Sequence, residues 1–135
     1  MAERPEPWLV SEQVALAVHD RQLAEHGGPC GVRDPSALAS ALARPFNRWA
    51  YDEGDFAQLA AAFAFGIARN HPFVDGNKRT AWVAARLFLR RNGRKLAFEE
   101  GEAVAFMRAL AAGELSEEEL AAWFRGRIAG REGSP

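Results

Sequence analysis

The ten residues 71–80, His-Pro-Phe-Val-Asp-Gly-Asn-Lys-Arg-Thr, combine side chains that could carry out chemistry. His71 supplies an imidazole, which can act as a proton acceptor. Asp75 offers a carboxylate for a hard cation such as Mg²⁺. Lys78 and Arg79 can neutralise phosphate charge. The segment therefore predicts a site for a phosphorylated ligand.

The expected position of this segment, at the start of a helix, strengthens that prediction. Helix starts present unpaired backbone N–H groups and a partial positive charge, which favour phosphate. Gly76 lets the backbone approach an anion closely, and the successive N–H groups of Gly76, Asn77 and Lys78 predict an anion-binding nest. Taken singly, each residue also has an ordinary interpretation, as a helix cap or a turn residue.

Positive charge is concentrated around the same segment. The chain has a formal net charge of −1, yet residues 69–95 carry eight Lys or Arg and one acid. Such a patch favours an anionic ligand, although charge alone also fits a solvated basic helix face. Lys78 is one of only two lysines beside 15 arginines, which suggests that a compact point charge is needed there.

Three other classes of site fit less well. A helix-turn-helix module would need a shorter connector than one that contains a proline, an aspartate and a glycine, and a more basic chain. A P-loop would need the order Gly-Lys-Ser/Thr after a strand. A metal hydrolase would need a ligand beyond His71 and Asp75. His19 and His26 are interpreted instead as surface or capping groups.

Composition predicts the scaffold. There are 27 alanines but only ten Val, Ile and Thr residues together, which favours an all-α fold, and 135 residues suit one domain over 1–135. Cys30 is the only cysteine, so an internal disulfide and a Cys-built zinc site are excluded. No apolar run reaches membrane-span length and no signal peptide is apparent, so we expect a cytoplasmic protein. Residues 1–7 and 131–135 are expected to be frayed.

About six helices are expected from apolar spacing and caps. They run over 11–26, from Pro35 to just before Pro45, and over 56–70, 77–91, 100–112 and about 117–129. Asp34, Asp55 and Ser116 are the predicted N-caps. An aromatic loop is expected through Asn47, Trp49, Tyr51 and Gly54, and residues 94–98 are expected to be extended.

The decamer closely resembles the Fic family signature, His-Pro-Phe-x-(Asp/Glu)-Gly-Asn-Gly-Arg-x-x-Arg. It departs from that pattern at Lys78 and at Trp82. Both departures match the Doc (death-on-curing) branch, toxins of type II toxin–antitoxin pairs, whose version reads His-x-Phe-x-Asp-(Ala/Gly)-Asn-Lys-Arg. Residues 31–45 look like the second Doc helix and residues 87–93 like the end of the motif helix. The resemblance covers about 11–127.

The resemblance implies a compact helical Fic/Doc domain with the motif loop between two central helices. His71 would be the general base, and Asp75 would hold Mg²⁺ against the phosphates of ATP. The backbone of residues 76–78 would form the anion hole, with the Lys78 and Arg79 side chains neutralising charge. Phe73 would bury the loop. Trp49 and Tyr51 would lie in a flap that aligns the target chain.

The resemblance also implies a reaction. Most Fic proteins transfer AMP, whereas Doc-like proteins transfer the γ-phosphate of ATP to a Ser or Thr hydroxyl, with elongation factor Tu as the known target. Lys78 favours the kinase, which would stop translation. AMP transfer is the alternative, and a non-enzymatic nucleic-acid-binding module is the second.

The same resemblance implies a partner. Many Fic proteins restrain themselves with a (Ser/Thr)-x-x-x-Glu-(Gly/Asn) segment, but no Ser or Thr stands four residues before any Glu-Gly pair here. Restraint would come from a Phd-type antitoxin whose C-terminal helix binds in a surface groove. Nucleic acid would be contacted only indirectly, through that antitoxin, and no membrane contact is expected.

Overall fold

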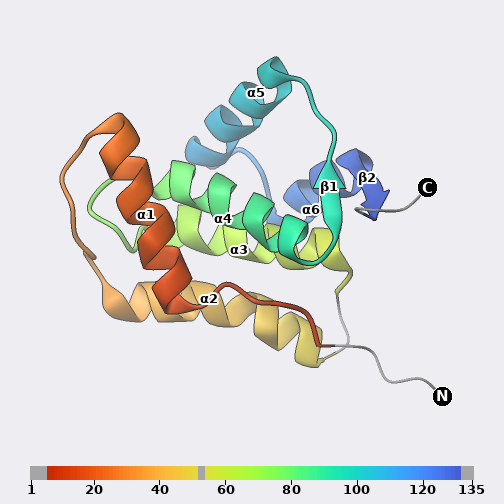
Figure 1. Ribbon diagram of the computed structural model, residues 1–135, viewed down its shortest axis with the longest axis horizontal. Coiled ribbons are helices and arrows are strands. Elements are labelled where there is room, and N and C mark those ends of the chain that lie inside the picture. The colour runs from red at the N-terminus through yellow and green to blue at the C-terminus, as the bar shows by residue number, and fades with distance from the viewer. Residues whose placement is uncertain (1–5, 52–53, 132–135) are drawn as a thin grey trace.

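The computed structural model describes residues 6–51 and 54–131. Within these residues the chain forms six helices and two short strands, so the all-α expectation is confirmed (Figure 1). The elements are α1 (Glu12–His26), α2 (Pro35–Ala50), α3 (Phe56–Asn70), α4 (Asn77–Arg91), β1 (Arg94–Leu96), α5 (Glu100–Ala111), α6 (Glu117–Arg127) and β2 (Ile128–Arg131). No helix among the described residues is long and apolar enough to cross a membrane.

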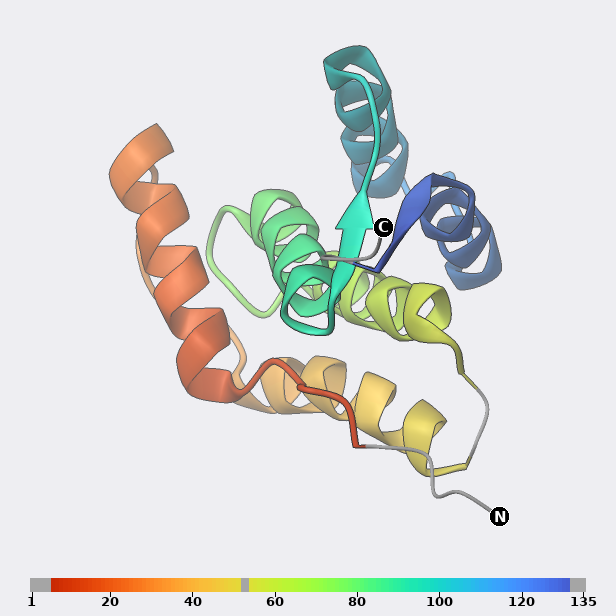
Figure 2. The same cartoon turned by 45° about the vertical axis from the view of Figure 1, so that its right-hand side comes forward.

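The helix α3 occupies the centre of the molecule and packs against α2, α4 and α6 (Figures 1 and 2). Its buried face is rich in alanine, including Ala60, Ala61 and Ala64. A methyl group added at Gly66 would lie 3.1 Å from the Cα of Ala41, so the backbones of α2 and α3 approach closely there. Because these small side chains allow close packing, α3 is a rigid support for the motif loop that follows it.

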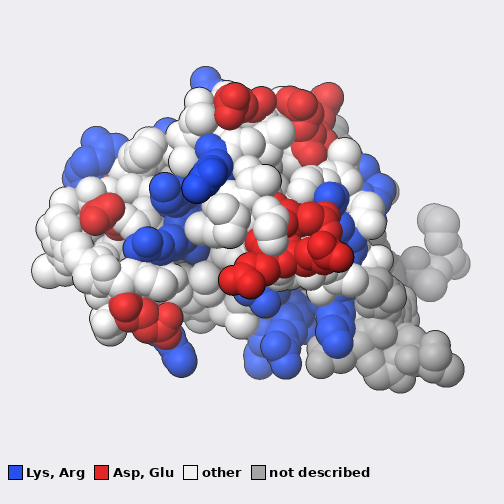
Figure 3. Space-filling model, turned by 90° about the horizontal axis from the view of Figure 1, so that it is seen from above, with Lys and Arg blue, Asp and Glu red and all other residues white. Residues whose placement is uncertain are grey.

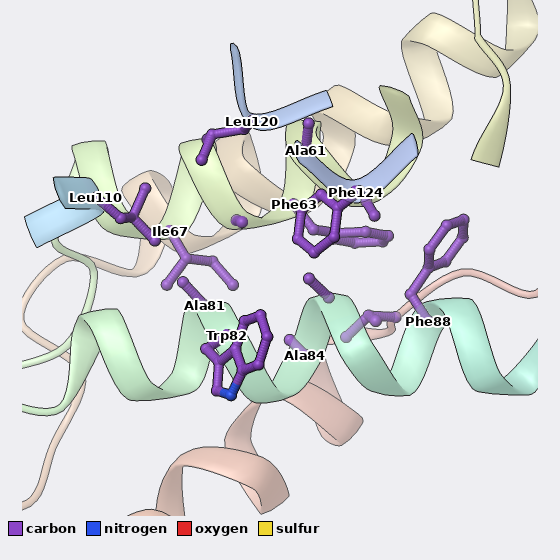
Figure 4. Packing of buried hydrophobic residues seen from close by; sticks show 14 of the residues in the cluster. Ala61, Phe63, Ile67, Ala81, Trp82, Ala84, Phe88, Leu110, Leu120 and Phe124 are labelled. Carbon is purple, nitrogen blue, oxygen red and sulfur yellow. The ribbon is translucent and has the colours of Figure 1, made fainter. Parts of the chain in front are cut away.

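Aromatic side chains fill the space between α3, α4 and α6 (Figure 4). The rings of Phe63 and Phe88 lie 5.1 Å apart, and Phe124 of α6 is fully buried. Trp82, which replaces the last arginine of the Fic signature, packs its ring 5.4 Å from Phe106 and 5.8 Å from Trp123. Trp82 therefore attaches α5 and α6 to the motif helix instead of pointing a charge at a ligand.

The three predicted N-caps, Asp34, Asp55 and Ser116, are confirmed, and Ser11, expected as the first helical residue, is the N-cap of α1. The side chains of Ser11 and Asp34 accept the backbone N–H groups of Val14 and Ala37. Asp55 and Ser116 each form a capping box, with Gln58 and Glu119 respectively at the third helical position. These caps satisfy N–H groups that helix geometry leaves unpaired.

Asp55 has a second role beyond its capping box. Its carboxylate forms an ion pair with Arg125, at 2.9 Å, which joins α6 to the start of α3. Partial burial raises the pKa of Asp55, but the hydrogen bonds from Arg125 and from the backbone of Gln58 outweigh it and hold that pKa below its ordinary value. The ionised form of Asp55 is therefore favoured in the folded protein.

The expectation that the second helix ends before Pro45 is wrong, because α2 continues to Ala50. Pro45 is fully buried. One turn apart on either side of it, Arg44 and Arg48 both bind the carboxylate of Glu117 in α6. These tertiary contacts outweigh the helix bond that a proline removes. The expected loop through Asn47 and Trp49 is consequently the last turn of α2.

The chain end also differs from expectation. The last helix ends at Arg127 rather than near residues 129–130, because residues 128–131 form β2. This strand pairs antiparallel with β1, where Leu96 lies opposite Ile128 and Arg94 opposite Arg131. Arg131, expected in a frayed end, is part of that strand. The rest of that end, 132–135, and residues 1–5 of the other lie outside the described residues.

Candidate active site

The motif loop connects α3 to α4 at one end of the helical layer (Figure 1). His71 is the C-cap of α3 and has φ 48°, the only positive φ among the described residues other than glycine. This left-handed conformation costs about 1–2 kcal/mol, although histidine tolerates it better than most residues. Gly76, at φ 78°, is the N-cap of α4. Both ends of the loop thus depend on left-handed backbone.

Asn77 closes the loop from inside. Its side chain is buried, accepts the N–H of Phe73 at 3.0 Å and donates to the Phe73 carbonyl at 2.9 Å. Phe73 is 1% exposed, as expected of an apolar anchor. The sequence indicated only a backbone contribution from Asn77. Its side chain fixes the path of the loop over Asp75 and Gly76.

His19 supports the loop from α1, and its interpretation as a surface or capping group is wrong. The ring is 2% exposed and stacks on Phe73, with 3.8 Å between centroids. Its Nε2 lies 2.8 Å from the carbonyl oxygen of Asp75, and because a carbonyl only accepts, Nε2 is the donor. The spacing of residues along the helix could have indicated its burial, because His19 shares the buried face of α1 with Ala15 and Gln22. His26 is exposed, as expected.

A second support comes from residues 31–34, which run beside the loop. Val74 N–H donates to the carbonyl of Gly31, and the N–H groups of Arg33 and Asp34 both donate to that of Pro72. The Arg33 side chain also donates, through Nε to the His71 carbonyl at 2.8 Å and through Nη2 to the Asn70 carbonyl at 3.0 Å. No spacing pattern indicated this contact.

Asp75 is exposed at the start of α4. Its Oδ1 accepts the N–H of Gly76 at 2.8 Å. Its Oδ2 faces Gly28 so closely that a methyl group added there would lie 2.6 Å away. Gly28, with φ +117°, is therefore a residue of this site that the motif does not include.

The donor set at Asp75 fits a nucleotide-bound magnesium ion. Within residues 6–51 and 54–131 no cluster of three His, Cys, Asp or Glu residues could hold a metal. Mg²⁺ usually keeps several waters and is bound through one or two carboxylates together with substrate phosphates. One exposed carboxylate beside a helix start meets that requirement, whereas a permanent structural metal would need more protein ligands.

Lys78 and Arg79 lie in the first turn of α4, Lys78 exposed and Arg79 half-buried. Neither forms a salt bridge within the described part of the chain. Arg86, two turns further on, instead lies over the rings of Trp82 and Phe98. Seen from above, basic and acidic side chains gather in separate groups on the surface (Figure 3). The cations at the helix start are therefore available to an anion.

His71 is also one of the residues that line a pocket of about 260 Å³. None of the other motif residues lines it. Its walls come from the end of α3 and from the end of α5 with the following turn, and its lining includes Phe65, Ala68, Arg69, Leu110 and Leu115. His71 thus ends α3 at an open space that both polar and apolar side chains line.

The expected flap residues do not join this site. Trp49 lies in the last turn of α2 and Tyr51 is its C-cap, at the opposite end of α3 from His71 (Figures 1 and 2). A helix of 15 residues separates its ends by about 22 Å at 1.5 Å per residue. The structure brings together His71, Asp75, Gly76, Asn77, Lys78 and Arg79, and leaves the two aromatic residues apart.

Comparison with known proteins gives a family and two named relatives. The family model described as Fic/DOC family matches residues 9–89. The chain is 37% identical to Protein kinase doc of Escherichia phage P1 over 108 residues. This match covers 79% of this chain and 85% of that protein. It is 49% identical over 74 residues to Toxin Doc of Mycolicibacterium smegmatis, covering 53% of this chain and 56% of that protein.

Proposed function

Because the chain belongs to the Fic/DOC family, we propose that it is a Doc-type toxin that acts as a protein kinase. It would transfer the γ-phosphate of ATP to a Ser or Thr hydroxyl of elongation factor Tu and so inhibit translation. The observation that carries this proposal is the start of α4, where Asp75, Gly76, Lys78 and Arg79 are consecutive or nearly so, a short loop away from His71 at the end of α3. The names of the two relatives, a protein kinase and a toxin, support it.

The residues at this site have distinct tasks in the proposed reaction. His71 takes the proton from the acceptor hydroxyl, whose oxygen bonds to the γ-phosphorus as the bond to the β–γ bridging oxygen breaks and ADP leaves. Backbone N–H groups at the start of α4, with Lys78 and Arg79, stabilise the charge on the transferred group. Mg²⁺, when bound with the nucleotide, supplies further charge neutralisation, and Asp75 would hold it.

Lys78 is the reason for preferring γ-phosphate transfer to AMP transfer. In the Fic signature a glycine stands at this position, and it leaves the phosphate chain a path along the backbone. A lysine at this position would crowd that path, and it adds a positive charge in the first turn of α4. Both effects favour binding the nucleotide with its terminal phosphate at the helix start.

A Phd-type antitoxin would restrain the toxin from outside. The chain has no inhibitory (Ser/Thr)-x-x-x-Glu-(Gly/Asn) segment. The proposed partner contributes an amphipathic C-terminal helix that lies in a surface groove, a common way to bind a helical domain. Any contact with DNA would be made by the antitoxin and not by the basic residues of α4.

The deciding experiment uses ATP labelled at either the α- or the γ-phosphate, incubated with the purified protein, Mg²⁺ and elongation factor Tu. We expect label on the factor only from the γ-position. His71→Ala should lower the rate by about 10²–10⁴-fold, since a positioned general base contributes that much. Arg86→Ala removes a cation of the same helix outside the site and is the matched control. Label only from the α-position would replace the kinase by AMP transfer.

Growth provides a second test that needs no known target. Expression of the wild-type chain without an antitoxin should arrest bacterial growth, and expression of His71→Ala should not. If both chains leave growth unchanged at equal protein levels, the toxin proposal fails. If both arrest growth equally, the arrest does not come from the proposed chemistry.

A further inference from the structure

Arg33 lies outside the motif, but its side chain binds directly to the backbone at His71. Its Nε donates to the His71 carbonyl at 2.8 Å and its Nη2 to the Asn70 carbonyl at 3.0 Å. These carbonyls stand at the C-terminal end of α3, where helix geometry leaves acceptors unpaired and the helix dipole is negative. A guanidinium suits this place because its rigid fork can bind two acceptors at once.

The main chain fixes where the Arg33 side chain begins. Residues Arg33 and Asp34 both donate their N–H groups to the Pro72 carbonyl, at 2.7 and 3.1 Å, and Val74 donates to that of Gly31. Val32 and Phe73 form an isolated antiparallel bridge between the same two segments. The backbone of Arg33 is therefore fixed against Pro72, the residue that follows His71, and its side chain extends from there to the His71 carbonyl.

The conformation of His71 makes this contact consequential. With φ 48°, His71 occupies a region that residues other than glycine rarely adopt. If its backbone left that region, the His71 carbonyl would turn away from Arg33 and the imidazole would change direction with it. The two hydrogen bonds from Arg33 favour the one backbone conformation that aims the ring of the proposed base.

Arg33 is exposed and is not part of the buried core. Replacing Arg33 should therefore change the orientation of the His71 ring while leaving the buried core of the fold intact. We propose that Arg33 is a positioning residue that holds the general base of the transfer reaction, an inference that rests on the proposed function of His71. It touches neither nucleotide nor acceptor and acts through His71.

The kinetic test compares Arg33→Ala, Arg33→Lys and Arg21→Ala in the γ-phosphate assay with elongation factor Tu. Arg21 is an exposed arginine of α1 that pairs with Glu25, so its loss controls for a surface charge. Because misplacing a reacting group by about 1 Å costs up to about 10²-fold, kcat should fall by about 10–100-fold in Arg33→Ala. KM for ATP should stay within about twofold, and Arg33→Lys should recover part of the loss through one hydrogen bond.

Chemical rescue separates positioning from a general structural effect. Added methylguanidinium should restore part of the activity of Arg33→Ala and none of that of His71→Ala. Wild-type kcat in Arg33→Ala, an equal loss in Arg21→Ala, or a loss that follows helix content measured by circular dichroism would each overturn the proposal.

A measurement without turnover keeps this inference separate from the proposed function. In protein labelled with ¹⁵N-histidine, the His71 ring should give one sharp set of resonances, which Arg33→Ala should shift or broaden while those of His26 stay unchanged. If the wild-type protein transfers no phosphate, the kinase proposal fails, yet this spectrum still decides whether Arg33 holds His71. An unchanged His71 signal in Arg33→Ala would refute the inference.

Discussion

Replacing Gly28 by alanine should displace the Asp75 carboxylate without substituting any residue of the motif. The added methyl group would lie 2.6 Å from the Asp75 Oδ2, and ordinary contact begins at 3.4 Å. The carboxylate must therefore move by about 0.8 Å or the loop must open. A displacement of that size at a reacting centre costs about 10²-fold in rate. We expect a loss of this order in γ-phosphate transfer at saturating ATP.

Gly27→Ala is the matched control for backbone strain. Gly27 also has a positive φ, +77°, but a methyl group there would meet nothing within 4 Å. Both substitutions should lower the free energy of unfolding by about 1–3 kcal/mol, the cost of forcing a side chain into such a conformation. Only Gly28→Ala should also lose most of its activity, whereas Gly27→Ala should stay within a few-fold of wild type.

Urea unfolding of a double-mutant cycle tests the same clash without activity. In an Asp75→Ala background the carboxylate is gone, so Gly28→Ala should cost only the strain that Gly27→Ala costs. The coupling between positions 28 and 75 should be about 0.5–3 kcal/mol, the range for residues in contact. Additive effects on stability, together with equal activity of the two glycine variants, would refute the reasoning about the site geometry.

Three further predictions concern the supports of the loop and the fold. Asn77→Ala should destabilise the protein by about 2–3 kcal/mol, because it leaves the buried N–H and carbonyl of Phe73 unpaired. Asn77→Asp retains an acceptor for the N–H and should cost less. The urea midpoints of the two variants will compare them. Asp55→Asn should remove part of the acid sensitivity of folding: the pKa of Asp55 is lowered in the folded state, so its contribution is present above the ordinary value of 3.8 and is lost as pH falls through the folded value. Thermal unfolding between pH 7 and pH 2 should show the variant changing less, and an unchanged pH dependence would contradict this. Glu117→Gln should cost about 1–2 kcal/mol, since the carboxylate binds both Arg44 and Arg48 across the α2–α6 contact, and charge-assisted hydrogen bonds are worth about that much; Glu118→Gln is the exposed control.

Much of the scaffold could be predicted from the sequence because its signals are local. Caps such as Asp34 and Asp55 act within four residues, and the spacing of apolar side chains marks α3 and α4 directly. Pro45 misled for the opposite reason. The local rule ends a helix there, but contacts of Arg44 and Arg48 with Glu117, about 70 residues away, keep α2 intact.

The candidate site divides in the same way. The motif residues are consecutive, so the start of α4 could be predicted from them, although the left-handed backbone of Gly76 is a finding of the structure. His19, Gly28 and Arg33 reach the site only through the packing of α1 and of the following loop, and their types alone do not indicate it. The expectation that Trp49 and Tyr51 lie in a flap at the site came from the family resemblance alone, and the structure places both residues at the end of α2, away from the motif loop.

The supports of the motif loop are distant along the chain, and this bears on when the site forms. His19 is 56 residues from Asp75 and Arg33 is 38 residues from His71. Closing loops of this length costs entropy before any contact offsets it, so we expect the loop to acquire its shape late in folding. A fragment that carried the decamer without residues 19–34 would have the sequence of the motif but not its folded geometry. The proposed transfer activity would likewise be absent from a growing chain until these tertiary contacts have formed.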